Sequence, residues 1–169
     1  MIKSLEYSLK KLNTDYVDLL LLRVVACDAG SAWSVLQRLY REGLVAVIGV
    51  CDHLGEFGAE NLAKIAQGSE VRPAVYQTRS RSYLRRFATR GKLTDHDVQV
   101  QLIYEPGEEL KEPALAQVSE KYGKTRTQII LRWLVQNGAC VIVNAGSKER
   151  LLENIDIFGF ELAARMPRR

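Results

Sequence analysis

Five short apolar segments, each followed by a stretch with helical spacing, constrain the fold of this chain more than any other feature. Runs of this length that are rich in β-branched residues are typical of strands, and YVDLLLL is apolar enough to predict a strand buried on both faces of a parallel sheet. Strands that alternate with helices predict right-handed crossovers and helices outside the sheet. The segments are YVDLLLL (16–22), LVAVIGV (44–50), PAVYQ (73–77), VQVQLIY (98–104) and CVIV (140–143).

The intervening stretches show the spacing of helices. Leu5, Leu9 and Leu12 recur at intervals of four and three, which lines one face of a helix. Gly43 is placed to end the helix that begins near Ser31, and Ser147 is placed to cap the last one. We expect helices over 4–12, from 31 to 42, 59–66, 113–122, 127–136 (well buried) and 148–155, with a weak helix over 84–89.

These elements leave two architectures open, a doubly wound sheet and a part of a (β/α)8 barrel. No GxGxxG pattern follows the first strand, so a dinucleotide-binding doubly wound sheet lacks its phosphate turn.

Composition sets the class of protein. With 169 residues, 47% hydrophobic and 26% charged, the chain suits one globular domain over 1–169. No apolar run approaches the roughly 20 residues of a membrane span, and the first residues lack a secretory core, so we expect no membrane association and a cytoplasmic location. The three widely spaced cysteines, Cys27, Cys51 and Cys140, predict neither a metal site nor a disulfide framework.

The positive charge is local. Residues 79–92 hold six cations and no carboxylate, and since the net charge is +4, the remaining residues carry −2. Arginines interleaved with Tyr83 and Phe87 would suit phosphate contacts and base stacking, so a non-catalytic nucleotide-, anion- or RNA-binding module is one alternative function. A solvated basic helix is the commoner meaning of such a run, and we therefore expect no nucleic-acid partner.

Five ordered motifs resemble the aldo-keto reductase family, the NADPH-dependent carbonyl reductases built on a (β/α)8 barrel. They are SLKKLNTDYVDLLLL, LYREGLVAVIGV, PAVYQ, SEKYGKTRTQIILRWLVQNGACVIV and GSKERLLENIDIFGFEL, and together they run from about 4 to 162. The resemblance implies an α/β chain of about five parallel strand-helix units, family strands 4 to 8. Because a complete barrel of this kind needs roughly 250 residues, we expect an incomplete barrel without strands 1 to 3.

The resemblance also implies what the active site lacks. The family's catalytic aspartate, tyrosine and lysine belong to the N-terminal part, which has no counterpart here, and Arg23 stands where the family's histidine ends strand four. An arginine donates hydrogen bonds but does not release a proton near neutral pH. Arg23 is therefore the one catalytic-position residue, and we expect little or no carbonyl reduction.

Part of the NADP(H) site is implied to remain. Cys51 and Asp52 stand in place of a Ser-Asn pair at the nicotinamide carboxamide, and Asn144 stands where a lysine grips the 2′-phosphate. By the same resemblance, Gln77 contacts the carboxamide, Tyr104 stacks under the nicotinamide, and Arg150 pairs with the phosphate. The implied cofactor-binding set is Cys51, Asp52, Gln77, Tyr104, Asn144, Arg150, Glu153 and Asn154.

Two expectations concern partners. A small carbonyl compound is the implied substrate of an active relative, while a five-strand arc would expose two sheet edges and an inner face. We therefore expect either that Met1 is internal to a longer reading frame or that the arc self-associates or packs on a partner, which would make it an interaction protein.

Overall fold

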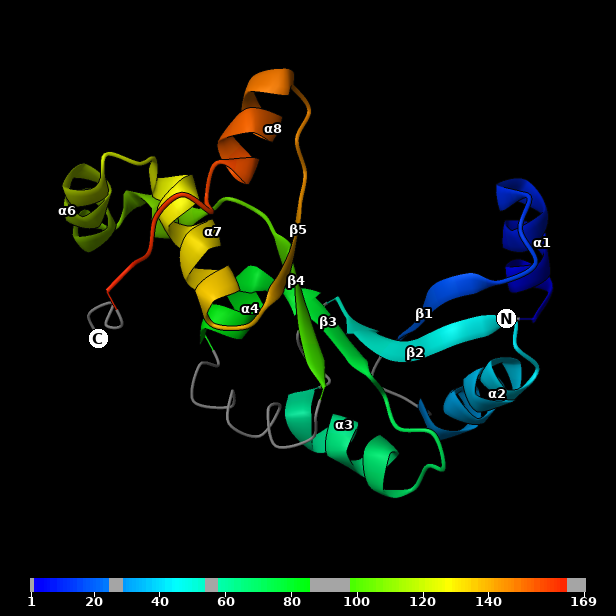
Figure 1. The fold of residues 1–169 in the computed structure, drawn as a ribbon. Coiled ribbons are helices and arrows are strands. Elements are labelled where there is room, and N and C mark those ends of the chain that lie inside the picture. The colour runs from blue at the N-terminus through cyan, green and yellow to red at the C-terminus, as the bar shows by residue number, and fades with distance from the viewer. Residues whose placement is uncertain (1, 25–28, 54–57, 86–97, 164–169) are drawn as a thin grey trace. The chain divides into compact units, whose positions relative to one another are not determined.

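The computed structural model describes residues 2–24, 29–53, 58–85 and 98–163 (Figure 1). Five strands form one sheet in the order β1-β2-β3-β4-β5, in which β1 pairs with β2, β2 with β3 and β4 with β5, each pair parallel. This confirms the parallel strand-helix architecture. The elements are α1 (Ile2–Leu12), β1 (Val17–Arg23), α2 (Ala29–Arg41), β2 (Val45–Asp52), α3 (Gly58–Gln67), β3 (Val75–Arg79), α4 (Ser80–Arg85), β4 (Gln99–Tyr104), the 3-10 turn η2 (Glu108–Lys111), α6 (Pro113–Tyr122), α7 (Arg126–Gln136), β5 (Cys140–Val143) and α8 (Lys148–Ile155).

The chain falls into two compact units, residues 1–100 and 101–169. Whether these two units form the single domain that the sequence predicts over 1–169 stays a prediction. Within the described ranges, no helix is both long enough and apolar enough to cross a membrane.

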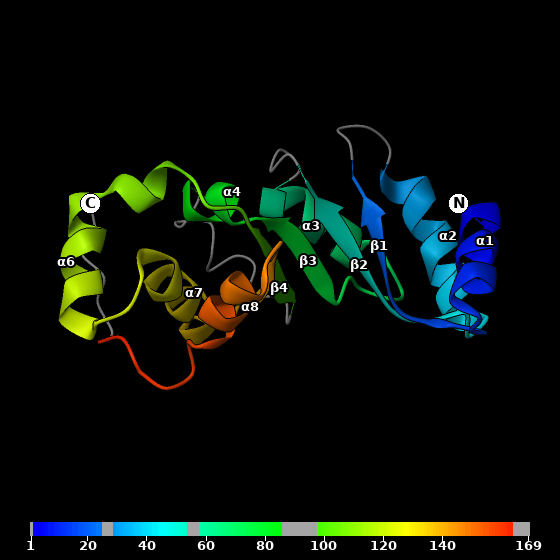
Figure 2. The ribbon, with the colours of Figure 1, turned by 90° about the horizontal axis from the view of Figure 1, so that it is seen from above.

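The first unit is built on the parallel strands β1, β2 and β3, which run side by side in Figure 2. One face of β2 presents Ile48 and Val50 to a core that also contains Trp33, Leu36 and Leu62 from α2 and α3. The Trp33 indole donates to the carbonyl of Val71 at 3.1 Å. This bond connects α2 to the segment that leads into β3.

The opposite face of these strands is less covered than the sequence predicts. In β1 only Leu22 is buried, Leu19 to Leu21 are half-buried, and Val47 of β2 is 37% exposed. The prediction that 16–22 is buried on both faces is therefore wrong. The physical reason is that β1 ends the sheet order and that α2, the helix in contact with both β1 and β2, covers one face of these strands.

The sequence predicts the end of α2 correctly but places the start of α4 wrongly. Gly43 has φ of 74° after α2, the left-handed conformation expected of a helix-ending glycine. The weak helix expected over 84–89 is wrongly placed, because α4 begins at Ser80 directly after β3; residues 86–89 lie outside the described part. Buried Ser80 and Tyr83, three residues apart, share a helix face that packs inward.

The second unit joins α6, α7, β5 and α8. Helix α7 buries Ile129, Ile130, Leu131 and Leu134, which confirms the prediction of a well-buried helix. Ser147 caps α8, since its Oγ accepts from the Arg150 backbone N–H at 3.3 Å, as expected. Both views place α8 beside α7 (Figures 1 and 2).

Candidate functional site

The carboxyl ends of the first three strands bring together three of the predicted site residues. In the parallel register Arg23 pairs with Cys51, and Cys51 pairs with Gln77. Neighbouring strands lie about 4.8 Å apart, so the three residues form a row across the sheet. The sequence predicts that each of the three residues lies at the end of a strand, and the strand register shows that they are direct neighbours across the sheet.

Burial governs the chemistry of the Cys51 thiol. Burial raises its pKa, the Arg23 cation lowers it, and the Asp52 carboxylate raises it again. The net direction is upward, so the thiol stays protonated near neutral pH and is a weak hydrogen-bond donor rather than a nucleophile.

Asp52 lies one residue further along β2 and is only 1% exposed. Alternation along the strand puts it on the face of Ile48 and Val50, which is the face that packs against α2. Its Oδ2 accepts from the Tyr76 hydroxyl at 2.7 Å and from the Gly58 N–H at 3.2 Å. The Thr78 hydroxyl donates to the Asp52 carbonyl at 3.0 Å. A role for Asp52 at a cofactor stays a prediction, whereas its contacts within the fold are observed.

The family resemblance assigned no role to Tyr76 or Thr78. Strand parity could have found both residues. Tyr76 and Thr78 are two apart on β3, so they share one face, and the register pairs Asp52 with Thr78.

Arg79 is the first residue of the basic stretch 79–92 and lies at the end of β3. One of its guanidinium nitrogens, Nη2, lies 2.6 Å from His53 Nε2, so His53 accepts a hydrogen bond there. Tyr83 is 7% exposed. Residues 86–92, including Phe87, lie outside the described part of the chain, and so does His96.

A separate pocket lies wholly within the second unit. Its volume is about 490 Å³. Its walls come from the end of β4, the start of α7, the turn after β5 and one face of α8. The lining includes every site residue that the resemblance implied for this unit, namely Tyr104, Asn144, Arg150, Glu153 and Asn154.

Tyr104 supplies a buried hydroxyl to this pocket. Burial raises the pKa of Tyr104 to about 12, the Glu109 and Glu153 carboxylates push it upward, and the Thr127 side chain lowers it. Within the described ranges no group completes a well-formed hydrogen bond to the Tyr104 hydroxyl oxygen. The phenol is therefore neutral and has hydrogen-bonding capacity left for a ligand.

The α8 side of the pocket is chemically mixed. Arg150 supplies a cation, Asn154 an amide and Glu153 a carboxylate whose Oε1 accepts from the Thr125 hydroxyl at 2.6 Å. Positions 150, 153 and 154 are three and four residues apart, so they share one helix face. A cation beside an amide and a carboxylate suits a ligand that carries both an anionic group and a polar heterocycle.

In the part of the chain that the structure describes, no three His, Cys, Asp or Glu side chains are grouped so that they could hold a metal ion. Cys51 and Cys140 are free thiols there, and Cys27 lies outside it.

Residues 1–94 match the model of the aldo/keto reductase family. An aldo-keto reductase of Mycolicibacterium smegmatis is 35% identical over 163 residues, which are 93% of this chain and 56% of that protein. A glyoxal reductase of Bacillus subtilis is 32% identical over 162 residues, covering 94% of this chain and 57% of that protein. The chain thus spans little more than half the length of the curated relatives it matches.

Solved structures agree on the fold. An aldo/keto reductase from Brucella melitensis superimposes with a TM-score of 0.80 at 33% identity, covering 96% of this chain and 63% of that one. A Bombyx mori aldo-keto reductase in complex with NADP gives a TM-score of 0.77 at 25% identity, with 95% and 58% covered. The strand-helix arc therefore corresponds to part of the (β/α)8 barrel of these proteins, as predicted.

Proposed function

Because this chain belongs to the aldo/keto reductase family, we propose that its second-unit pocket holds the adenosine-phosphate part of an NADP(H) cofactor. One observation carries the proposal. Asn144, Arg150, Glu153 and Asn154, which the family resemblance implied for the phosphate and the adenine, line one pocket, and Tyr104, implied for the nicotinamide, lines it as well. Residues that come from a strand, a turn and a helix gather in this way only through the fold.

The chemistry of the lining fits this ligand. The Arg150 guanidinium would pair with the 2′-phosphate, because a planar cation with several N–H donors suits phosphate oxygens. The Asn154 amide and the Glu153 carboxylate would meet the donors and acceptors on the edge of the adenine. Asn144, which stands in place of the family's lysine, adds an amide but no second cation. We therefore expect weaker phosphate binding than in a relative that keeps the lysine.

The row in the first unit holds the residues that the resemblance implies for the nicotinamide carboxamide. The Gln77 amide would hydrogen-bond the carboxamide, and the protonated Cys51 thiol would add a weak donor. The cofactor, when bound, supplies hydride for reduction of a carbonyl carbon.

Arg23 limits what this chain does with a carbonyl substrate. Its guanidinium would donate a hydrogen bond to a carbonyl oxygen but would not pass on a proton at neutral pH. We therefore propose that this chain is an aldo-keto reductase-like oxidoreductase module that binds the cofactor and by itself performs little or no carbonyl reduction. A cytoplasmic location and a small carbonyl substrate belong to this proposal. The alternative role in anion or RNA binding is less favoured, since Tyr83, one of the aromatic residues it would use, is buried.

Cofactor titration tests the proposal. NADPH should quench the tryptophan fluorescence of the wild-type chain, and Arg150→Ala should weaken NADPH binding about tenfold or more while changing NADH binding little, because only NADPH carries the 2′-phosphate. Lys148→Ala is the matched control, because Lys148 is an exposed cation on the same helix that does not line the pocket.

Two results would count against the proposal. A wild-type chain that binds no NADPH at millimolar concentration lacks the proposed site. Steady oxidation of NADPH with a small aldehyde, followed at 340 nm, would show that the proposed impairment is wrong.

A further inference from the structure

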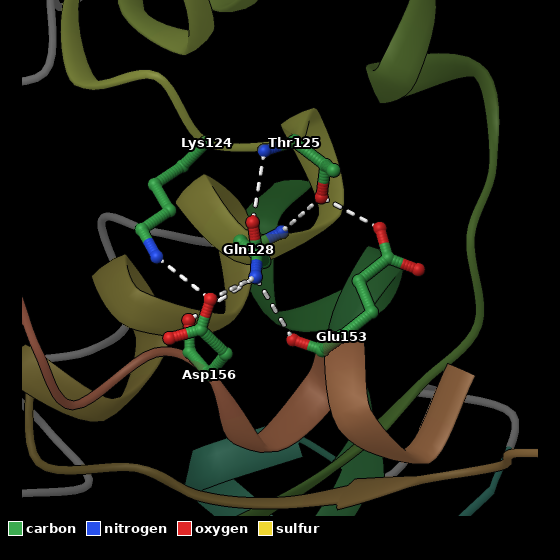
Figure 3. A network of polar contacts seen from close by, with 5 residues as sticks. All are labelled: Lys124, Thr125, Gln128, Glu153 and Asp156. Atoms are coloured by element: carbon green, nitrogen blue, oxygen red, sulfur yellow. Dashed lines mark hydrogen bonds and ion pairs between the residues drawn. The ribbon is translucent and has the colours of Figure 1, made fainter. Parts of the chain in front are cut away.

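We propose that Gln128, which does not line the pocket, is a positioning residue that aims the pocket face of α8. The inference rests on the proposed function. Gln128 lies on α7 and is 6% exposed, so its amide is a buried polar group whose partners determine the local structure. Figure 3 shows the network around it.

The amide oxygen of Gln128 serves its own helix. Gln128 Oε1 accepts from the Thr125 N–H at 3.0 Å, and the Gln128 N–H donates to Thr125 Oγ1 at 3.2 Å. This reciprocal pair is a capping box, which satisfies two otherwise unpaired N–H groups at the start of α7. Since the oxygen is used there, the amide nitrogen is directed the other way, toward α8.

The amide nitrogen of Gln128 meets three acceptors at the carboxyl end of α8. Gln128 Nε2 lies 3.2 Å from the Glu153 carbonyl oxygen, 3.1 Å from the Asp156 carbonyl oxygen and 3.2 Å from Asp156 Oδ2. The last carbonyls of a helix lack partners within the helix, so a side-chain donor there ends the helix and holds it in place. One side chain therefore connects the first turn of α7 to the last turn of α8.

Two neighbouring contacts reinforce this connection. The Lys124 ammonium group donates to Asp156 Oδ2 at 2.7 Å, and the Thr125 hydroxyl donates to Glu153 Oε1 at 2.6 Å. The second contact acts on a residue that lines the pocket. The network thus reaches the pocket through both the backbone and the side chain of Glu153.

Apolar packing does not orient α8. The helix has no buried residue, and its large apolar side chains, Leu151, Leu152 and Ile155, are 57%, 59% and 67% exposed. A helix without a buried apolar stripe has little to determine its rotation about its own axis. The polar contacts from Lys124, Thr125 and Gln128 are therefore the structural reason why Arg150, Glu153 and Asn154 face the pocket.

Gln128→Glu isolates the connection to α8. The carboxylate keeps an acceptor for the Thr125 N–H, and thus the α7 cap, but it loses both amide hydrogens and places a negative charge against Asp156. Gln136→Glu is the matched control, since Gln136 on the same helix accepts from the Leu162 N–H at 2.8 Å and donates to the Leu162 carbonyl at 3.2 Å. The control changes the same amide on the same helix but leaves α8 untouched.

The experiment has two readouts on the full chain at pH 8. The first is amide hydrogen exchange of α8, which Gln128→Glu should speed about tenfold relative to wild type and to Gln136→Glu, because the helix loses its end contacts. The second is the ratio of affinities for adenosine 2′,5′-bisphosphate and adenosine 5′-monophosphate. Gln128→Glu should lower this ratio about tenfold, whereas a general loss of stability would weaken both nucleotides alike.

Each result of these two measurements either supports or overturns the proposed role of Gln128. Unchanged α8 exchange in Gln128→Glu overturns the inference, and so does faster exchange with an unchanged nucleotide ratio. If the wild type binds neither nucleotide, the proposed function fails, and exchange of α8 alone then decides for or against Gln128. If Gln128→Glu does not fold, Gln128→Met replaces it, because that variant removes the amide without adding a charge, and the same criteria apply.

Discussion

We expect the Asp52 carboxylate to stabilise the first unit. Measuring this contribution distinguishes a structural role of Asp52 from the cofactor-binding role that the family resemblance implies. Asp52→Ala removes the acceptor of the Tyr76 hydroxyl, which lies at 2.7 Å, and of the Gly58 N–H, at 3.2 Å. Both Asp52 and Tyr76 are buried, so water does not readily replace the lost partner.

The magnitude follows from these contacts. A buried donor left without its partner costs about 1–3 kcal/mol, and a hydrogen bond to a charged acceptor contributes about 1.5–3 kcal/mol. Gly58 is only half-buried, so its N–H adds little. Asp52→Ala should therefore lower the free energy of unfolding by about 2–4 kcal/mol, a large part of the roughly 5–15 kcal/mol typical of a domain.

Urea unfolding followed by circular dichroism measures the loss, and a double-mutant cycle assigns it. Tyr76→Phe alone should cost about 1.5–3 kcal/mol because it leaves the buried carboxylate short of a donor. The double variant should cost clearly less than the two single losses added together, since the contact is counted once.

Two results would refute this reasoning. Additive losses in the cycle would mean that Asp52 and Tyr76 are not coupled. An Asp52→Ala chain that keeps its wild-type unfolding midpoint but loses NADPH binding would return Asp52 to the cofactor role implied by the resemblance.

Two further predictions concern packing and ionisation. Gly49→Ala should cost about 1–3 kcal/mol of stability, because the added Cβ would lie 2.5 Å from the Val75 carbonyl oxygen. Gly30→Ala is the control, because a Cβ at that position meets no atom within 4 Å. Equal urea midpoints for wild type and Gly49→Ala would contradict the strand register. Tyr104 has its pKa raised from 10.0 to about 12, so the stability it contributes is complete below pH 10 and is lost as the pH rises through 12. The stability difference between wild type and Tyr104→Phe should shrink over that range, and parallel pH profiles would show that the phenol is not buried.

The order of strands and helices was predictable because it depends on short-range pattern. CVIV predicts β5, and the helices at 113–122 and 148–155 have the predicted bounds, since their caps and turns are encoded within a few residues of the sequence. Ser147 and Gly43 act as predicted for the same reason. Helix α4 was misplaced because its start depends on Ser80 packing inward, which no local signal shows.

The candidate site divides in the same way. The family motifs identified Tyr104, Asn144, Arg150, Glu153 and Asn154, and the fold brings these residues to one pocket. The motifs assigned no role to Gln128, because its partners lie 25 and 28 residues further along the chain.

By itself, the sequence determined the alternation of strands and helices, the family and five candidate site residues that the fold brings to one pocket, because spacing and ordered motifs carry that information. Only the tertiary structure decided that Asp52 accepts from Tyr76 and that Gln128 holds the end of α8. The physical reason is that a buried carboxylate or amide takes its role from the donors and acceptors that distant segments bring within about 3 Å.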